Sequence, residues 1–476
     1  MNAKKKRDFT EGPLFKNLLL FALPVMATGL LQMLYNAADK LVVGQFSGDT
    51  LALGAIGSTT FISALIINFL AGVGGGSGIV TAQFFGARRD GETSRAVHTS
   101  IIMAVGIGLI MTVVAFLTAE PLLLLLGTKP ELMSRALSYL RIIYVGIVAS
   151  SLYNTVAAIF RSVGDSRTPL IIGSIAGVMN VALNFILVIF FGLSVEGVGW
   201  ATTISQYFSA VASIVVLARR QGESYAFSFK KLRCDMNLML RVIRIGLPTG
   251  LQSTCFSLTN MITTAAVNTF PTEYVTAHSV SGNIDGILDV ISVSFMHSAM
   301  NAAGQNYGAM NTKRVKRVFY YSIIQGAAIT FAVAMIIRIL RADIAGLFVD
   351  VSDPNRDLII AATVEWTGVM LSTYFLQAVM NAVIGTVRGL GYSVSPLICN
   401  IIGTCATRIA WVYLVFFNVE PLHNFGGLAM LYPVSWFSAS AIFTVLVLIA
   451  FKKLGRLDAA SAATESEESD SLANTA

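Results

Sequence analysis

The chain of 476 residues is 55% hydrophobic and only 12% charged, and its mean hydropathy is +0.71. A soluble globular protein has about 25% charged residues. This composition therefore excludes a soluble globular protein and indicates one that crosses a membrane several times. The net charge of +7 does not indicate nucleic-acid binding, because most basic residues fall in loops that we place on one side of the membrane.

Twelve apolar stretches are long enough to cross a hydrocarbon core of about 30 Å. We therefore predict an all-α polytopic membrane protein with twelve transmembrane helices. The predicted spans cover residues 15–39, 52–84, 95–118, 134–158, 168–191, 197–218, 239–265, 275–305, 317–339, 361–386, 394–417 and 426–450.

Composition also divides the chain into parts. A basic connection after the sixth span is the boundary between two halves. The Ser-, Ala- and acid-rich C-terminus has almost nothing to bury and is predicted to be disordered. The predicted parts are a cytoplasmic N-terminal segment 1–14, a first lobe 15–218, a cytoplasmic linker 219–238, a second lobe 239–452 and a disordered acidic tail 453–476.

The loops differ in charge between the two sides of the membrane. One side is rich in lysine and arginine, as at Lys4 to Arg7 and in the connection between the halves, whereas the other carries Asp49, Glu196 and Asp350. Because basic loops remain in the cytoplasm, the sequence predicts a plasma (inner) membrane protein with both termini cytoplasmic.

Two motifs indicate that the halves repeat. Residues 83–87 (QFFGA) recur as 305–309 (QNYGA), and residues 161–169 (RSVGDSRTP) recur as 388–396 (RGLGYSVSP). Each half has an even number of spans, so both halves enter the membrane from the same side. We therefore predict two six-helix lobes related by a pseudo-two-fold axis along the membrane normal, with a cavity between them, as in transporters.

The first span contains an acid, Asp39, which costs about 2.5–3.5 kcal/mol in hydrocarbon and so indicates function. Gln32, Asn36 and Asp39 are spaced by four and three residues and share one helix face. Pro24 removes a backbone donor and favours a bend. A bendable helix with a titratable face can couple a proton or cation to a change of shape. The alternative is an acid near the helix end that pairs with Lys40.

Polar side chains of later spans are candidates to hydrogen-bond Asp39 in both of its protonation states. Asn180 and Asn184 lie one turn apart on the fifth span, and Asn154 and Thr202 lie on the fourth and sixth. The alternative is polar packing between helices, which is worth about 0.6 kcal/mol per bond in membranes.

The second half has two acids of its own. Asp285 and Asp289 are four residues apart on one face of the eighth span, and Arg408 lies at similar depth on the eleventh. One interpretation is a structural ion pair between Arg408 and one acid, because an unpaired buried charge is costly. One arginine neutralises only one acid, so the other is a candidate for cation binding or proton exchange.

Together these features resemble the multidrug and toxic compound extrusion (MATE) family over nearly all of residues 12–452. The resemblance rests on the pattern Pro24…Asn36-Ala37-Ala38-Asp39…Val43-Gly44, the two Gln-x-x-Gly-Ala motifs and the paired Arg-x-x-Gly-x-Ser-x-x-Pro loops. It implies a secondary transporter that expels organic cations or other xenobiotics in exchange for protons or sodium.

The resemblance also implies roles for single residues. Family members that couple in the N-terminal lobe carry an acid at the position of Asp39. Related sequences often have a second acid where this chain has Asn184, so coupling in the first lobe would rest on Asp39 alone. An acid at the position of Asp285 occurs in some branches. The sodium-coupled branch has acids on helices seven and ten, and the predicted helix seven has none.

The sequence therefore predicts an efflux antiporter for small amphipathic cations that works by alternating access, with H⁺ or Na⁺ as the coupling ion. We expect a monomer in contact with membrane lipid, without cofactor, bound metal or nucleic acid. The alternative is a flippase or exporter of a lipid-linked or other endogenous metabolite. An enzyme is not expected, because the sequence has no HExxH or Gly-x-Ser-x-Gly motif and its four histidines are dispersed.

Overall fold

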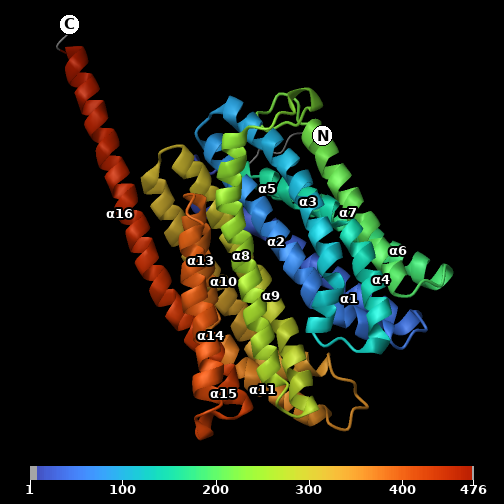
Figure 1. Cartoon of the computed structure of the whole chain (residues 1–476). Coiled ribbons are helices and arrows are strands. Elements are labelled where there is room, and N and C mark those ends of the chain that lie inside the picture. The colour runs from blue at the N-terminus through green and yellow to red at the C-terminus, as the bar shows by residue number, and fades with distance from the viewer. Residues whose placement is uncertain (1–7, 474–476) are drawn as a thin grey trace.

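The computed structural model describes the backbone of residues 8–473 and the side chains of residues 8–456. All regular structure in this part of the chain is helical, and long helices run side by side (Figure 1). The α-helices are α1 (Leu14–Phe46), α2 (Ala52–Gly86), α3 (Asp90–Leu125), α4 (Pro130–Val145), α5 (Ile147–Ser162), α6 (Arg167–Phe185), α7 (Val195–Ala218), α8 (Met236–Val267), α9 (Thr272–Gly308), α10 (Thr312–Gly346), α11 (Arg356–Thr373), α12 (Phe375–Gly389), α13 (Val394–Asn400), α14 (Thr407–Ala410), α15 (Phe425–Ala429) and α16 (Leu431–Ala473). Shorter π and 3-10 segments are η1 (Ile186–Phe190), η2 (Phe229–Lys231), η3 (Ile401–Ala406), η4 (Trp411–Phe416) and η5 (Glu420–Leu422).

The membrane-spanning character of the helices follows from their length and composition. Within the described residues, eight spans are long and apolar enough to cross a membrane, and two bent pairs of helices raise the number to ten. α8 and α9 are also long, with 32 and 37 residues. Each is longer than the roughly 20 residues that a membrane crossing needs. The prediction of an all-helical, multi-pass membrane protein is confirmed.

Two of the spans are bent, which was not predicted from the sequence. α4 and α5 meet at an angle of 47° at Gly146, and α11 and α12 meet at 47° at Tyr374. At the first bend, a Cβ atom added to Gly146 would overlap Gln206 Oε1, the flexible end of a side chain of α7, and would lie 3.1 Å from the carbonyl oxygen of Ile143. Neither break contains proline, so neither carries the usual sequence signal of a kink.

The two halves share their local backbone geometry. Among the described non-glycine residues, positive φ angles occur at Arg88 (57°) and Met310 (55°), which directly follow the two Gln-x-x-Gly-Ala motifs. Gly164 and Gly391, with φ angles of 84° and 92°, occupy matching places in the paired Arg-x-x-Gly loops. These matches support the predicted repeat at the level of single backbone angles.

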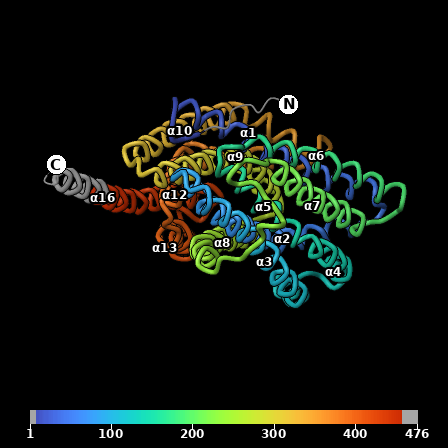
Figure 2. Tube along the Cα trace, turned by 90° about the horizontal axis from the view of Figure 1, so that it is seen from above, coloured from blue at the N-terminus to red at the C-terminus, as the bar shows by residue number. Residues whose placement is uncertain are grey.

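The helices group into an N-lobe, α1 to α7, and a C-lobe, α8 to α16, which lie side by side when viewed from above (Figure 2). The lobes meet through α1 against α9 and through α2 against both α8 and α9. Since α8 and α9 are the repeat partners of α1 and α2, the same helices of each half form the interface. This is the arrangement expected of a two-fold axis that runs along the bundle.

The contact between α2 and α8 depends on glycine. A Cβ atom on Gly72 would lie 2.5 Å from the Cα atom of Gly250, and one on Gly76 would lie 2.7 Å from the Cα atom of Gly246. Small residues let two backbones approach in this way within membranes. The glycine-rich part of the second span is thus a helix-packing surface.

Two glutamines tie the lobes together at one end of the bundle. We call this the proximal end, the upper end in Figure 1, and the opposite end distal. Gln83 Nε2 donates to the carbonyl of Gly389 at 2.8 Å, while its Oε1 accepts from Arg241 at 2.6 Å. Its repeat partner Gln305 also makes two hydrogen bonds with its amide, described next. Each glutamine uses both ends of its amide to reach the other lobe.

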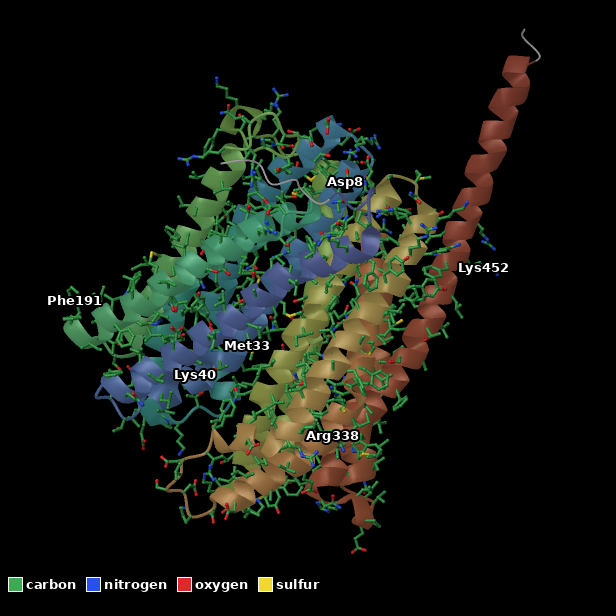
Figure 3. The ribbon with its side chains drawn as sticks, turned by 180° about the vertical axis from the view of Figure 1, so that it is seen from behind. Asp8, Met33, Lys40, Phe191, Arg338 and Lys452 are labelled. Atoms are coloured by element: carbon green, nitrogen blue, oxygen red, sulfur yellow. The ribbon has the colours of Figure 1, made fainter. Side chains whose placement is uncertain are left out.

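Gln305 Nε2 donates to the carbonyl of Ser162 at 2.7 Å, and its Oε1 accepts from the backbone N–H of Phe9 at 3.0 Å. We call the four hydrogen bonds made by Gln83 and Gln305 the glutamine clasp. The N-terminal segment adds to it, because Arg314 donates to the carbonyls of Phe9, Glu11 and Gly12 at 2.8 Å each. Figure 3 shows α1 running from this end, near Asp8, toward Lys40 at the distal end.

α16 extends far beyond the bundle (Figure 1). Its backbone is helical to Ala473, whereas a disordered tail was predicted for residues 453–476, of which 474–476 lie outside the described residues. The physical reason is that alanine and glutamate favour helix, and extending an existing helix avoids the cost of nucleating a new one.

Candidate functional site

Asp39 lies about two turns from the distal end of α1, where α6 packs between α1 and α7. Asn184 Nδ2 donates to Asp39 Oδ1 at 2.5 Å. With the Asn180 amide in the orientation that satisfies its neighbours, its Nδ2 donates to the same oxygen at 2.9 Å. Its Oδ1 then accepts from the backbone N–H and the hydroxyl of Thr202, both at 3.3 Å. In the described chain, the carboxylate is therefore held by neutral amide donors.

The structure leaves two of the predicted site residues outside this network. Asn36 is exposed, and Asn154 donates to the carbonyl of Ser150 on its own helix at 2.9 Å. Among the hydrogen bonds of the described residues, none joins either side chain to Asp39. Pro24 lies inside the continuous helix α1, where its carbonyl accepts from the Thr28 hydroxyl at 2.8 Å.

The acids of the C-lobe form a ladder with the bent pair α11–α12. Tyr374, the residue at the bend, donates its hydroxyl to Asp285 Oδ1 at 2.8 Å. One turn further, Gln377 Nε2 donates to Asp289 Oδ1 at 2.8 Å. One more turn on, Asn381 Nδ2 donates to the Ser292 hydroxyl at 2.8 Å. The backbone bend thus lies directly beside the first acid.

Arg408 does not form an ion pair with Asp285 or Asp289, which was one interpretation of the sequence. Its side chain donates to Asn260 Oδ1 at 2.9 Å and to the Ser435 hydroxyl at 3.2 Å. It also lies over the rings of Tyr432 and Phe256, 4.6 and 5.4 Å from their centroids. An amide, a hydroxyl and two aromatic faces satisfy the guanidinium, so it acts on Asp285 only at longer range.

The donors of the C-lobe ladder were not among the site residues predicted from the sequence. Tyr374, Gln377 and Asn381 are spaced by three and four residues and so share one helix face, opposite Asp285, Asp289 and Ser292, which are spaced by four and three. This matching spacing is visible in the sequence. The bend at Tyr374 obscured it, because a single straight span gives no reason to single out that residue.

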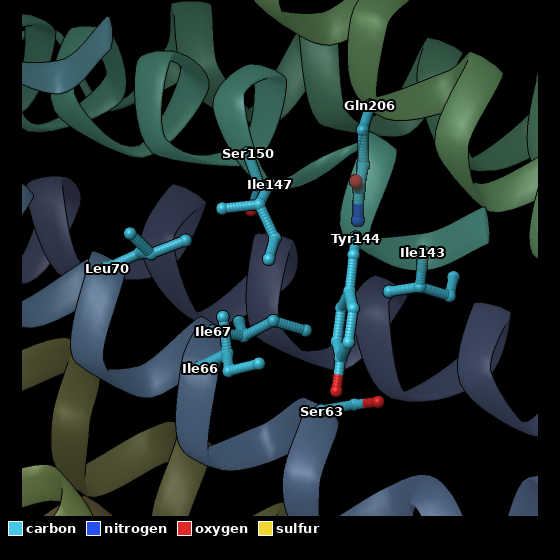
Figure 4. A pocket seen from close by; sticks show the side chains of 9 residues that line it. All are labelled: Ser63, Ile66, Ile67, Leu70, Ile143, Tyr144, Ile147, Ser150 and Gln206. Atoms are coloured by element: carbon cyan, nitrogen blue, oxygen red, sulfur yellow. The ribbon is translucent and has the colours of Figure 1, made fainter. Parts of the chain in front are cut away.

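A small hollow in the N-lobe lies beside the bend between α4 and α5 (Figure 4). The hydroxyl of Tyr144 points toward Ser63, and the amide of Gln206 approaches from α7. Tyr144 OH, Ser63 Oγ and Gln206 Oε1 are buried without hydrogen-bond partners in the described chain. Polar atoms of this kind suit a polar guest such as an ordered water.

A family comparison identifies the class of protein. The MatE family model matches residues 24–186 and 248–414, one match in each lobe and together more than half of the chain. The chain belongs to the MATE family of multidrug efflux transporters. This membership places it among membrane transporters rather than enzymes.

Relatives match along most of their length. The chain is 24% identical to the probable multidrug resistance protein YpnP of Bacillus subtilis, over 86% of this chain and 90% of YpnP. It is 22% identical to the multidrug export protein MepA of Staphylococcus aureus, over 81% of both chains. A solved structure of a multidrug resistance MATE transporter in an outward-facing conformation superposes with a TM-score of 0.87 and 19% identity, covering 95% of this chain and 99% of the other.

Proposed function

We propose that this transporter exports small amphipathic cations in exchange for protons or Na⁺, with Asp39 as the coupling group of the N-lobe. The observation that carries the proposal is that Asn180 and Asn184 both donate to one Asp39 oxygen. Asp39 Oδ2 accepts no described hydrogen bond, so it is available to a proton, a cation or the charged group of a substrate. Because its hydrogen-bond donors are neutral, the negative charge of the carboxylate is left to be compensated by the proton, the cation or the charged group of the substrate.

Asp285 and Asp289 are proposed as a second cation- or proton-binding group. Both carboxylates are held by neutral donors, and the first of these donors is the residue at the bend of α11–α12. A change of charge at Asp285 therefore acts directly on a point where the backbone changes direction. In this way loss or gain of a proton or cation can favour one arrangement of the lobes over the other.

The remaining features follow from the same proposal. Substrate would occupy a central cavity that opens alternately to either side as the lobes rock. The proximal end, which carries the basic loops, would face the cytoplasm, so that both termini are cytoplasmic. The protein would act as a monomer in the plasma membrane.

The test is transport of ethidium into or out of proteoliposomes that contain the purified full-length protein. A pH gradient and a Na⁺ gradient are imposed separately, on the wild type and on Asp39→Asn and Asp285→Asn. Asp49→Asn, which changes an acid in a distal loop, is the matched control. Gradient-driven movement that is lost in Asp39→Asn and retained in Asp49→Asn supports the proposal.

Other outcomes revise it in defined ways. Full coupled transport by Asp39→Asn removes this residue from the coupling role. Movement that fails only in Asp285→Asn assigns coupling to the C-lobe. No movement of ethidium by the wild type under either gradient contradicts a cation antiporter and favours export of an endogenous metabolite.

A further inference from the structure

Two arginines that the proposed function does not use lie near the proximal end of the bundle. Arg161 is the second-last residue of α5, and Arg388 is the second-last residue of α12. They are repeat partners, and each directly precedes an acceptor of the glutamine clasp, Ser162 or Gly389. Arg388 is only 5% exposed, and Arg161 is partly buried. Both therefore lie at the junction of the lobes, away from Asp39.

Neither arginine has an acidic partner among the described residues. Arg388 Nη2 donates to Gln252 Oε1 at 2.7 Å, and Nη1 lies 3.9 Å from the sulfur of Met296. Its Nε is buried and has no hydrogen-bond partner. For Arg161, the described chain supplies neither a hydrogen bond nor an ion pair. Five guanidinium donors in a fixed planar fork are thus unused at Arg161, and the Nε donor of Arg388 is unused as well.

His297 on α9 directly follows Met296, whose sulfur lies 3.9 Å from Arg388 Nη1. Further along the same helix, Gln305 donates to the carbonyl of Ser162, the residue after Arg161. The Nδ1 atom of His297 is buried and has no hydrogen-bond partner in the described chain. Unpartnered nitrogen atoms from α5, α9 and α12 therefore lie along α9, and they come from both lobes.

There is unfilled space at the equivalent place in the other lobe. The repeat that relates Gln83 to Gln305 relates Gly75 to His297. Gly75 is buried, yet a Cβ atom added to it would meet nothing within 4 Å. The glycine thus leaves room on α2 where α9 carries an imidazole.

A buried guanidinium without a counter-ion is costly, and a second one nearby adds like-charge repulsion. An anion would relieve both costs, and the planar fork of arginine fits the oxygens of a phosphate particularly well. We propose that Arg161, Arg388 and His297 form a binding site for a phosphate group at the proximal junction of the lobes. The phosphate is either a free anion or the headgroup of an anionic lipid.

The proposal is tested by following thermal unfolding of the full-length protein in detergent while a ligand is titrated. The probes are inorganic phosphate and dihexanoyl phosphatidic acid, with sodium chloride at equal ionic strength and dihexanoyl phosphatidylcholine as references. The wild-type midpoint should rise saturably with a phosphate probe and not with the references. Arg161→Gln and Arg388→Gln should each need at least ten times more probe, whereas Arg317→Gln, which removes an exposed proximal charge, should respond like the wild type.

The shift of the unfolding midpoint with each probe distinguishes the two sources of phosphate. A saturable rise with inorganic phosphate assigns a free anion, and a rise with phosphatidic acid alone assigns a lipid headgroup. No saturable rise with either probe in the wild type overturns the proposal, whatever the variants do. Without ligand, Arg161→Gln should unfold at the wild-type temperature or above, because it removes a charge without a partner. A clear fall there would also overturn it.

Discussion

At the scale of single residues, the acids of both lobes share one kind of environment. The amides of Asn180 and Asn184 donate hydrogen bonds to Asp39, and the hydroxyl of Tyr374 donates one to Asp285. An amide or a phenol has both donor and acceptor atoms, so it can hydrogen-bond a carboxylate or, after local rotation, a protonated carboxyl. A close arginine would instead fix the ionised form. Because Arg408 forms no ion pair with Asp285, it does not fix the ionised form of that carboxylate.

Tyr374→Phe should lower the stability of the C-lobe. It removes the donor to Asp285 Oδ1 and leaves a carboxylate in the span with one fewer partner, which typically costs about 1–3 kcal/mol. The measurement is the thermal unfolding midpoint of the purified variant in detergent, which should fall. Tyr207→Phe is the matched control, because its exposed hydroxyl donates only to the carbonyl of Val145 at 2.9 Å and should matter less. Equal midpoints for wild type and Tyr374→Phe would contradict this role.

Asp49 gives a prediction about pH outside the spans. Its carboxylate accepts from Arg135 Nε at 2.5 Å and from the Ser194 hydroxyl at 3.2 Å. The hydrogen bond from Arg135 is the main cause that holds the pKa of Asp49 below its ordinary value of 3.8. A lowered pKa means that the pair stabilises the fold fully above the ordinary value, and that this contribution is lost as the pH falls through the lower, folded-state pKa.

We therefore expect wild type to unfold at a higher temperature than Asp49→Asn at pH 6. The pair is partly exposed, so the difference should be about 1 kcal/mol or less. It should shrink as the pH is lowered from 5 to below 3.8. Unfolding midpoints of both proteins across this range provide the check. A difference that grows toward acid pH would mean that the carboxyl is stabilised in its protonated form.

At the scale of helices, the crossing of α2 and α9 depends on two glycines. A Cβ atom on Gly86 would lie 2.0 Å from the carbonyl oxygen of Gln305, and one on Gly308 would lie 1.9 Å from that of Gln83. Both contacts are with backbone, so neither helix can yield by turning a side chain. The same pair of contacts is made in both directions across the two-fold axis.

Gly86→Ala should therefore separate α2 from α9 and weaken the protein. Overpacking typically costs about 1–3 kcal/mol, and backbone-to-backbone overlap belongs at the upper end. Gly57→Ala on the same helix is the control, because an added Cβ atom meets nothing within 4 Å there and alanine is the better helix former. The thermal midpoints of both variants decide the matter. A Gly86→Ala protein as stable as Gly57→Ala would show that the crossing is not tight.

Helix positions and the repeat could be read from the sequence because hydropathy and motif spacing are local properties. The contact of Asp39 with α6 was anticipated from the spacing of Asn180 and Asn184. The bends at Gly146 and Tyr374 were not predicted, since neither break contains a proline and the contacts made there, such as that of Tyr374 with Asp285, join residues distant in sequence. The partners of Arg408 were also not predicted. From the sequence its charge was expected to pair with an acid, whereas contacts with the faces of aromatic rings leave no sequence signature.

At the scale of the whole molecule, the glutamine clasp joins the lobes at the proximal end, together with the hydrogen bonds from Arg314 to the N-terminal segment. Its four bonds join Gln83 to Gly389 and Arg241, and Gln305 to Ser162 and Phe9. At about 0.5–1.5 kcal/mol each, they supply about 2–6 kcal/mol to this arrangement. Roughly 5.5 kcal/mol moves a two-state equilibrium from 99:1 to 1:99, so the clasp is of the size that sets the balance between two arrangements of the lobes.

The double variant Gln83→Ala, Gln305→Ala should accordingly release the proximal ends of the lobes. The four cysteines are first replaced, and spin labels are attached at the exposed positions Arg95 on α3 and Lys313 on α10. Pulsed electron paramagnetic resonance then measures the distance between the two labels, and so between the lobes. Wild type should give one main distance, and the double variant should add a longer one. Gln221→Ala, in the exposed connection after α7, is the control. An unchanged distance distribution in the double variant would mean that glycine packing between α2, α8 and α9 holds the lobes without the clasp.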